Sequence, residues 1–178
     1  VPVIIGTGAV SYNDHMKFIE KVSDIKFAGI HILPFDLKMG KSRTISLYEK
    51  IANHSPYPVW MYHNPKRGRS FELDTIKILS EHHNIDGIKM GGYSLNDLTK
   101  CFMLKNNNFD VVAAGSGQVY QMMCLGAKAH TTSEGSIFPR LFKKIIDLYN
   151  EGNHEESWKL QQSWIILNSK IPRTDNGE

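Results

Sequence analysis

The stretch Asn84-Ile85-Asp86-Gly87-Ile88-Lys89 is a short apolar run that ends in one lysine and is followed by two glycines. Such a run is typical of a buried strand, and Lys89 would then lie at the strand's end with apolar neighbours. A lysine in that place can be desolvated, lose its proton and attack a carbonyl carbon. A second run, Val59-Trp60-Met61-Tyr62, ends in a tyrosine that can move protons for it.

Strand-like and helix-like segments alternate along the chain outward from this stretch. Helix starts are expected after Ser11 and Ser94, because each serine is followed three residues later by a capping carboxylate. A last helix is expected from Asn153 to about Asn168, and a loose polar tail from Pro172. Each predicted strand is followed by a helix, and the strands are expected at residues 3–5, 29–33, 59–62, 85–89, 111–114 and 127–132.

Two architectures fit repeated strand–helix units, a doubly wound open sheet and a barrel of eight units. The segment Gly6-Thr7-Gly8 lacks the third glycine of a dinucleotide fingerprint and the lysine of a P-loop, which counts against the open sheet. A full barrel has about 250 residues. We therefore expect an α/β fold, a (β/α)8 TIM barrel whose first two units are absent from this sequence. Strands three to eight are expected in residues 1–152, and an additional C-terminal helix in residues 153–178.

Composition excludes several classes of function. The 21 basic and 18 acidic residues are mixed along the chain, so nothing indicates a nucleic-acid partner. No apolar stretch approaches the length of about 18 residues that a membrane span needs. Cys101 and Cys124 lack the spacing of metal ligands, which favours a reduced, cytoplasmic protein in which both thiols are at least half-buried.

Glycine-rich or polar residues follow every predicted strand, at the edge where parallel α/β folds bind ligands. From the residues alone, Lys89 and Tyr62 form the candidate pair for imine chemistry, which needs a nucleophilic amine and a proton carrier. His63 and His130 lie at or near the same edge, where local hydrogen bonding is the alternative role. No His, Asp or Glu spacing indicates a metal site.

These residues resemble the dihydrodipicolinate synthase / N-acetylneuraminate lyase family of class I aldolases and related dehydratases. Residues 1–9 resemble that family's third barrel strand, and Tyr62-His63-Asn64-Pro65-Lys66-Arg67 resembles its Tyr-Asn-x-Pro-x-Arg element. Gly87-Ile88-Lys89 resembles its Gly-Ile-Lys strand. Residues 112–117, 125–127 and 138–139 resemble its late-barrel pattern, so the likeness covers nearly the whole chain in the right order.

The resemblance implies that Lys89 forms the imine and that Tyr62 transfers protons. It implies pyruvate or another 2-keto acid as the substrate, no metal or organic cofactor, and a homo-oligomer, dimer or tetramer. The expected substrate-binding residues are Gly6, Thr7, Arg67, Gly115, His130 and Thr132.

Some residues depart from the family pattern. His63 stands in place of the asparagine after the tyrosine, and Met90 in place of the acidic residue after the lysine. Asp36 stands where synthases carry a second tyrosine, which counts against the lysine-biosynthetic synthase. The leading hypothesis is a Schiff-base lyase, aldolase or dehydratase. The alternative is a non-catalytic barrel that binds keto acids or acts as a scaffold.

Overall fold

The computed structural model describes residues 3–172 of the 178-residue chain. The predicted loose tail beyond Pro172 lies outside the described residues. Residues 1 and 2, which directly precede the predicted first strand, lie outside them too. The chain divides into two compact units, Val1–Ala113 and Ala114–Glu178. The predicted division at residue 152 remains a prediction.

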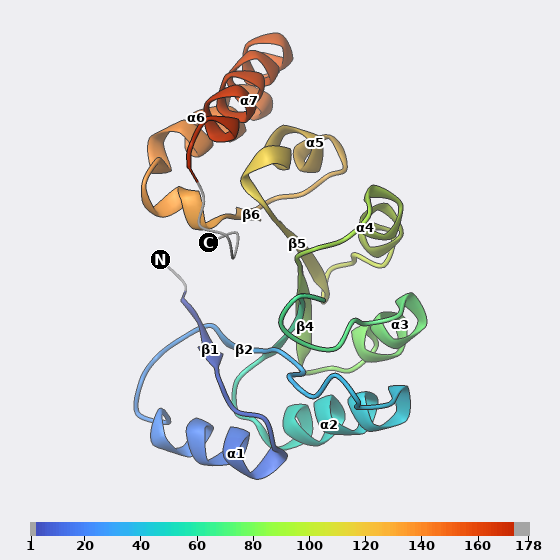
Figure 1. Cartoon of the computed structure of the whole chain (residues 1–178). Helices are drawn as coiled ribbons and strands as arrows, with labels where there is room; N and C mark the ends of the chain where they lie inside the picture. The colour runs from blue at the N-terminus through green and yellow to red at the C-terminus, as the bar shows by residue number, and fades with distance from the viewer. Residues whose placement is uncertain (1–2, 173–178) are drawn as a thin grey trace. The chain divides into compact units, whose positions relative to one another are not determined.

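The first unit is built on parallel strands that pair in the order in which they occur in the chain (Figure 1). The strands are β1 (Ile4–Thr7), β2 (Gly29–Ile32), β3 (Val59–His63), β4 (Ile85–Met90) and β5 (Asp110–Ala114), the last of which ends at the unit boundary. A doubly wound sheet reverses its strand order at a switch point, and this order never reverses. Consecutive units of a (β/α)8 barrel have this topology.

The four helices of the first unit lie along one face of these strands (Figure 1). They are α1 (Tyr12–Lys21), α2 (Lys41–His54), α3 (Leu73–Ser80) and α4 (Leu95–Phe102). The two predicted caps are confirmed, because Ser11 and Ser94 accept hydrogen bonds from the N–H groups of Asp14 and Asp97. The helix-covered face of the strands is apolar and buried, and it includes Ile30, Ile32, Val59, Met61, Ile88, Met90 and Val111.

The opposite face of the strands carries the candidate chemistry, since successive side chains of a strand point to opposite sides. Tyr62 pairs with Lys89, and Trp60 pairs with Gly87 at an earlier position along the same two strands. A Cβ atom on Gly87 would lie 2.5 Å from the carbonyl oxygen of Asp110 and 2.6 Å from the Trp60 ring. Only glycine therefore fits at position 87. The indole ring of Trp60 lies against Gly87, on the strand that also carries Lys89.

The turn before β4 is held by Asn84. Its side-chain amide nitrogen donates to the carbonyl oxygens of Ala52, Ser55 and Tyr57, at 2.8, 3.0 and 3.3 Å. These carbonyls belong to the end of α2 and to the turn that enters β3. One side chain thus fixes where β3 and β4 begin, and with it the pairing of the residues at their far ends.

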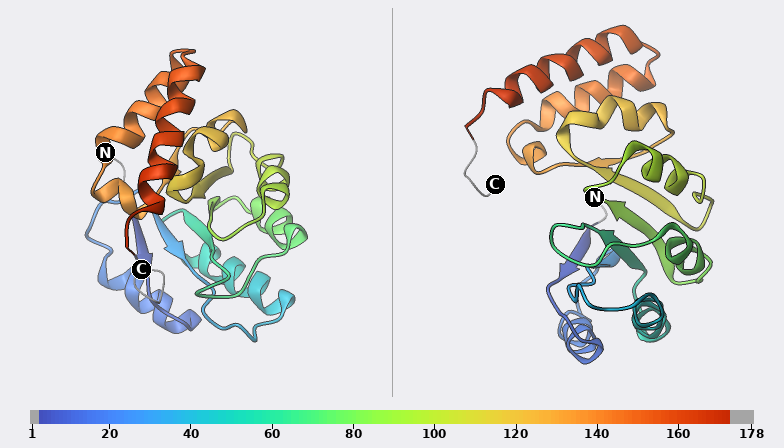
Figure 2. Two further views of the ribbon diagram at one scale, coloured as in Figure 1. Left: turned by 45° about the horizontal axis from the view of Figure 1, so that its top comes forward. Right: turned by 45° about the vertical axis from the view of Figure 1, so that its right-hand side comes forward.

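The second unit is mostly helical, and α5 (Val119–Cys124), α6 (Pro139–Asn150) and α7 (His154–Ser169) pack on one another (Figure 2). Short 3-10 turns, η1 (Ser116–Gln118) and η2 (Ser133–Ser136), flank the two-residue strand β6 (His130–Thr131). The buried core of this unit comprises Val119, Phe142, Ile145 and Trp164. Among the residues that the structure describes, no helix is both long and apolar enough to cross a membrane.

Two expectations are wrong in part. The strand predicted at residues 127–132 is shorter, because Gly126, with φ of +87°, ends α5 and the Ala127 N–H still bonds back to Met122. Cys101 of the first unit is buried as expected, but Cys124 of the second is exposed. The buried residues of α5 are Val119, Met122 and Met123, and Cys124 turns away from them.

Gln161 of α7 is fully buried and joins the last helix to the loop that follows β5. Its side-chain oxygen accepts from the Tyr120 N–H at 3.1 Å, and its side-chain nitrogen donates to the Ser116 carbonyl at 3.1 Å. Both ends of the side-chain amide are thereby satisfied in the interior, as buried polar groups require.

Candidate functional site

Lys89 and Tyr62 lie side by side on β4 and β3. The Lys89 Nζ atom is 4.5 Å from the centroid of the Tyr62 ring, and both side chains are half-buried. An ammonium group over an aromatic face is attracted by the ring. The pairing of these two strand positions therefore brings an amine and a phenol together, as the sequence predicts.

The Tyr62 hydroxyl is oriented by Asn64, two residues further along the chain. The Asn64 side-chain nitrogen donates to the Tyr62 hydroxyl oxygen at 2.9 Å. The phenol acts as the acceptor in that bond, so its own O–H remains available to donate to another group. Asn64 was not among the predicted site residues, although its neighbour His63 was considered as a candidate.

A cavity of about 220 Å³ opens beside the Tyr62 ring. Three predicted substrate-binding residues, Gly6, Thr7 and Arg67, line it together with Tyr62. The remaining lining residues are Gly8, His31, Leu33 and Phe35. The ends of β1, β2 and β3 thus contribute to one cavity, as expected for the C-terminal edge of a parallel sheet.

The Thr7 hydroxyl is engaged with the first helix. Its oxygen accepts from the Ala9 N–H at 3.1 Å and lies 3.2 Å from Nδ1 of His15, a side chain that is 1% exposed. Burial lowers the pKa of His15 to about 4, against the opposing effect of the Asp14 carboxylate. His15 is therefore neutral in the folded protein at neutral pH, and it anchors the end of β1 at Thr7.

The burial of His15 predicts a loss of stability in mild acid. In the window between the ordinary histidine pKa of 6.5 and the folded value of about 4, the unfolded chain binds a proton that the folded chain does not. The free energy of unfolding should fall in this window as pH falls, by up to about 1.4 kcal/mol per pH unit from this group. His15→Gln should flatten the dependence, as measured by urea unfolding across the window.

The control for this measurement is Asn13→Gln, an exposed and non-ionising change in the same helix. This variant should keep the slope of the parent protein. A His15→Gln protein with the same pH dependence as the parent would show that His15 is protonated equally in the folded and unfolded chains.

His31 is the residue of this region that the sequence interpretation missed. Its ring lies 4.5 Å from the Tyr62 ring, centroid to centroid, at an interplanar angle of 30°. Burial first, and the charge of Lys89 second, lower the pKa of His31 to about 4. A signal was present in the sequence, since His31 is the one polar side chain in the apolar run Gly29-Ile30-His31-Ile32-Leu33.

The other three predicted binding residues, Gly115, His130 and Thr132, lie in the second unit. Gly115 follows β5 with φ of +116°, a conformation that favours glycine, and its N–H donates to the Thr131 carbonyl at 3.1 Å. A ring nitrogen of His130, Nε2, lies 2.8 Å from the Gly115 carbonyl oxygen. Burial lowers the pKa of His130, and the bond to Gly115 opposes this. His130 thus holds the loop that begins at Gly115.

The hydroxyl of Thr132 is directed to a carboxylate close to it in the chain. Glu134 accepts hydrogen bonds from Thr132, from Ser116 at 2.9 Å and from Ser133 at 3.0 Å. Burial raises the pKa of this carboxyl group, but the hydroxyl groups and the backbone that donate to it outweigh burial, and the pKa is lowered overall. Glu134 is therefore an ionised centre that arranges the turn after β6.

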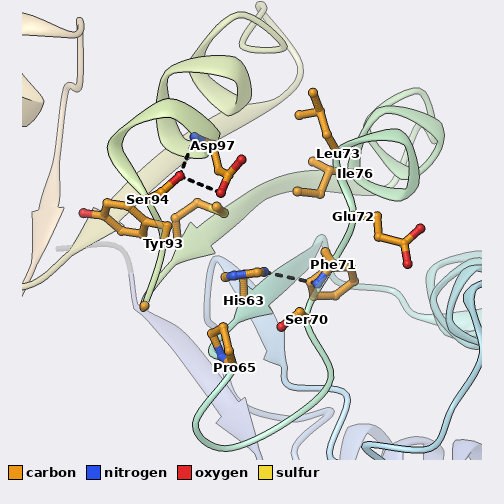
Figure 3. A pocket seen from close by; sticks show the side chains of 12 residues that line it. His63, Pro65, Ser70, Phe71, Glu72, Leu73, Ile76, Tyr93, Ser94 and Asp97 are labelled. Atoms are coloured by element: carbon orange, nitrogen blue, oxygen red, sulfur yellow. Dashed lines mark hydrogen bonds between the residues drawn. The ribbon is translucent and has the colours of Figure 1, made fainter.

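His63 occupies the other face of β3 and lies in a separate cavity of about 310 Å³, between the loops that precede α3 and α4 (Figure 3). Its Nδ1 atom accepts from the Phe71 N–H at 3.2 Å. Burial lowers its pKa, while the Asp97 carboxylate opposes that shift. The structure thus separates His63 from the face that carries Lys89 and Tyr62.

The comparisons with known proteins identify the family to which the chain is similar. A profile of the dihydrodipicolinate synthetase family matches residues 1–176. The 4-hydroxy-tetrahydrodipicolinate synthase of Parabacteroides distasonis is 25% identical over 177 residues, 96% of this chain and 59% of the relative. That of Methanococcus maripaludis strain C6 is 27% identical over 170 residues, 94% of this chain and 58% of the relative. The chain spans about three fifths of the length of these relatives.

Solved structures confirm the predicted fold. Dihydrodipicolinate synthase from Bacillus anthracis has a TM-score of 0.84 at 25% identity, covering 91% of this chain and 56% of that one. The 2-keto 3-deoxygluconate aldolase from Picrophilus torridus has a TM-score of 0.86 at 19% identity, covering 95% and 62%. The fold is that of strands three to eight of a (β/α)8 barrel with an additional C-terminal helix. Since the family profile matches all but two residues of the sequence, the chain belongs to the dihydrodipicolinate synthetase family.

Proposed function

We propose that this chain carries the Schiff-base site of a lyase, aldolase or dehydratase that acts on pyruvate or another 2-keto acid. The main support for this proposal is that the Lys89 amine lies 4.5 Å from the centroid of the Tyr62 ring. The two residues are paired on the neighbouring strands β4 and β3. The chain belongs to a family whose relatives named above are synthases and an aldolase, which supports chemistry of this class.

In the proposed reaction, the uncharged amine of Lys89 attacks the keto carbon and forms a carbinolamine. Loss of water then gives an iminium, which accepts the electron pair when a bond at the neighbouring carbon breaks and leaves an enamine. Tyr62 carries the protons that these steps release and require. Its hydroxyl suits that role because Asn64 donates to the oxygen and leaves the O–H free to point toward substrate.

In the first unit, the substrate would be held by residues close to this pair. Gly6 and Thr7 border the cavity beside Tyr62, and Arg67 brings a guanidinium that suits a carboxylate. We assign Gly115, His130 and Thr132 to substrate binding within the second unit. The proposal requires no metal or organic cofactor. It includes the homo-oligomer that the family resemblance implies and the cytoplasmic location that the spacing of the two cysteines favours.

The positions that depart from the family pattern bear on the alternative, a non-catalytic barrel. Met90 is buried on the helix-covered face, where its sulfur lies 3.8 Å from the Cys101 thiol. His63 faces the same side and accepts from Phe71. Asp36 is exposed and accepts from the Lys38 N–H. Met90 and His63 thus lie on the face opposite the Lys89–Tyr62 pair, and these two changes give no reason to prefer the non-catalytic hypothesis.

The proposal is tested by trapping the imine. The full-length protein that contains this sequence is treated with pyruvate and sodium borohydride, and its peptides are analysed by mass spectrometry. One reduced pyruvate is expected on Lys89, and none when pyruvate is replaced by lactate, which has no keto group. Absence of the adduct, or an adduct confined to other lysines, would overturn the assignment.

A further inference from the structure

His31 lies at the junction between the candidate reactive pair and the cavity beside it. Its ring stacks on the Tyr62 ring at 4.5 Å, and it also lines the cavity of about 220 Å³. It occupies the strand position paired with Trp60 on one side and with Gly6 on the other. All three are on the face of the sheet that carries Lys89, so a molecule bound at Lys89 and extending into the cavity meets this imidazole.

The imidazole has an unmet hydrogen-bonding capacity. Its Nε2 atom is buried, and it has no hydrogen-bond partner among residues 3–172. A buried polar atom without a partner is unusual and calls for a bound water or a ligand group. The ring lines the cavity, but Nε2 itself has almost no exposed surface, so a small turn of the imidazole would bring that nitrogen to a group bound there.

The surroundings of His31 also determine which kind of group fits. Burial and the positive charge of Lys89 keep the ring uncharged at neutral pH, with a pKa of about 4. The charged or titratable groups that face it are Lys89, Tyr62 and Arg67, and no carboxylate of the described residues lines the cavity. An uncharged imidazole offers one N–H and one lone pair, which match a hydroxyl group that both accepts and donates.

We propose that His31 recognises a hydroxyl group on the carbon chain of the substrate, so that the site favours hydroxylated aldehydes, and the keto acids formed from them, over their deoxy analogues. The apolar walls formed by Leu33 and Phe35 take the carbon skeleton. This inference rests on the proposed function, since it concerns the substrate that Lys89 binds. It assigns a specificity-determining role to a residue outside the pair that carries the chemistry.

The test compares glyceraldehyde with propanal, which share a three-carbon chain and differ only in hydroxyl groups. The kcat/KM for condensation of each aldehyde with pyruvate is measured for the full-length protein, for His31→Leu and for His31→Gln. The parent protein should prefer glyceraldehyde. His31→Leu should lower that preference by about tenfold, because it removes one neutral hydrogen bond. His31→Gln should keep most of it, since the amide supplies a donor and an acceptor.

The ratio of the two rates is insensitive to a general loss of active protein. If His31→Leu does not fold, the parent protein alone still decides the question. In the borohydride-reduced adduct, the His31 ring nitrogens should shift in NMR spectra when glyceraldehyde is added, and they should not shift with propanal.

The outcomes separate the two proposals. If the parent protein forms no pyruvate adduct on Lys89, the proposed function fails and this inference fails with it. If the adduct forms but the aldehyde ratio is the same in the parent and His31→Leu, only the role of His31 is overturned. A parent protein that forms the adduct but shows no preference for glyceraldehyde likewise overturns the role of His31 alone.

Discussion

Lys89→Arg is expected to abolish the trapped pyruvate adduct and to lower kcat by about a thousandfold or more. Arginine keeps the positive charge and can still stack over Tyr62, so the pocket keeps its electrostatic character. A guanidinium cannot lose its proton in a protein, and it therefore offers no lone pair to a carbonyl carbon. The measurement is steady-state turnover of a 2-keto acid together with mass analysis of the borohydride-treated protein.

Lys77→Arg is the matched control, because Lys77 is an exposed lysine of α3. This control should retain both turnover and the adduct on Lys89. Turnover in Lys89→Arg within a few fold of the parent would mean that another group performs the chemistry. In that case the reactive amine would have to be sought elsewhere in the chain.

Trp164→Ala is expected to destabilise the second unit by about 3–5 kcal/mol. Trp164 is 1% exposed, and its ring packs against those of Phe138 and Phe142, at centroid distances of 5.4 and 5.2 Å. Truncation leaves a cavity that these rings and Ile145 cannot fill without repacking. The loss is read from the free energy of unfolding in urea, with the slope of the transition compared between variants.

Two further variants separate packing from other effects. Ile166→Ala lies on the same helix but at 59% exposure, so it should change stability little. Trp164→Phe should cost less than the alanine change, since it keeps most of the apolar contact. It also loses no hydrogen bond, because the indole nitrogen has no partner among the described residues. Equal losses in Trp164→Ala and Ile166→Ala would contradict this account of the core.

The sequence predicted the strands of the first unit well because each is a short apolar run bounded by residues that stop it. The helix starts at Ser11 and Ser94 were predictable for a similar reason, since a cap involves residues only three positions apart. Lys89 and Tyr62 could be brought together because parallel strands align their ends. These features depend on local sequence and on one general property of parallel sheets.

The features that the sequence did not reveal depend on contacts between distant residues. His31 gains its significance only from the register that places its ring against Tyr62. Cys124 was expected to be at least half-buried, and the short helix α5 turns it outward. The extent of β6 was overestimated because the bonds that close α5 extend to Ala127. No local pattern encodes such contacts.

The position of Gln161 has a consequence for the order in which the protein is assembled. Its partner Ser116 lies 45 residues earlier, so the loop after β5 leaves the ribosome long before the helix that supplies this bond. Contacts between residues so far apart in sequence form late, because the chain between them must first be ordered. We therefore expect the loop that begins at Gly115 to reach its final conformation only after α7 has been synthesised. Folding of the chain at the end of β5 is then completed late, after most of the protein has left the ribosome.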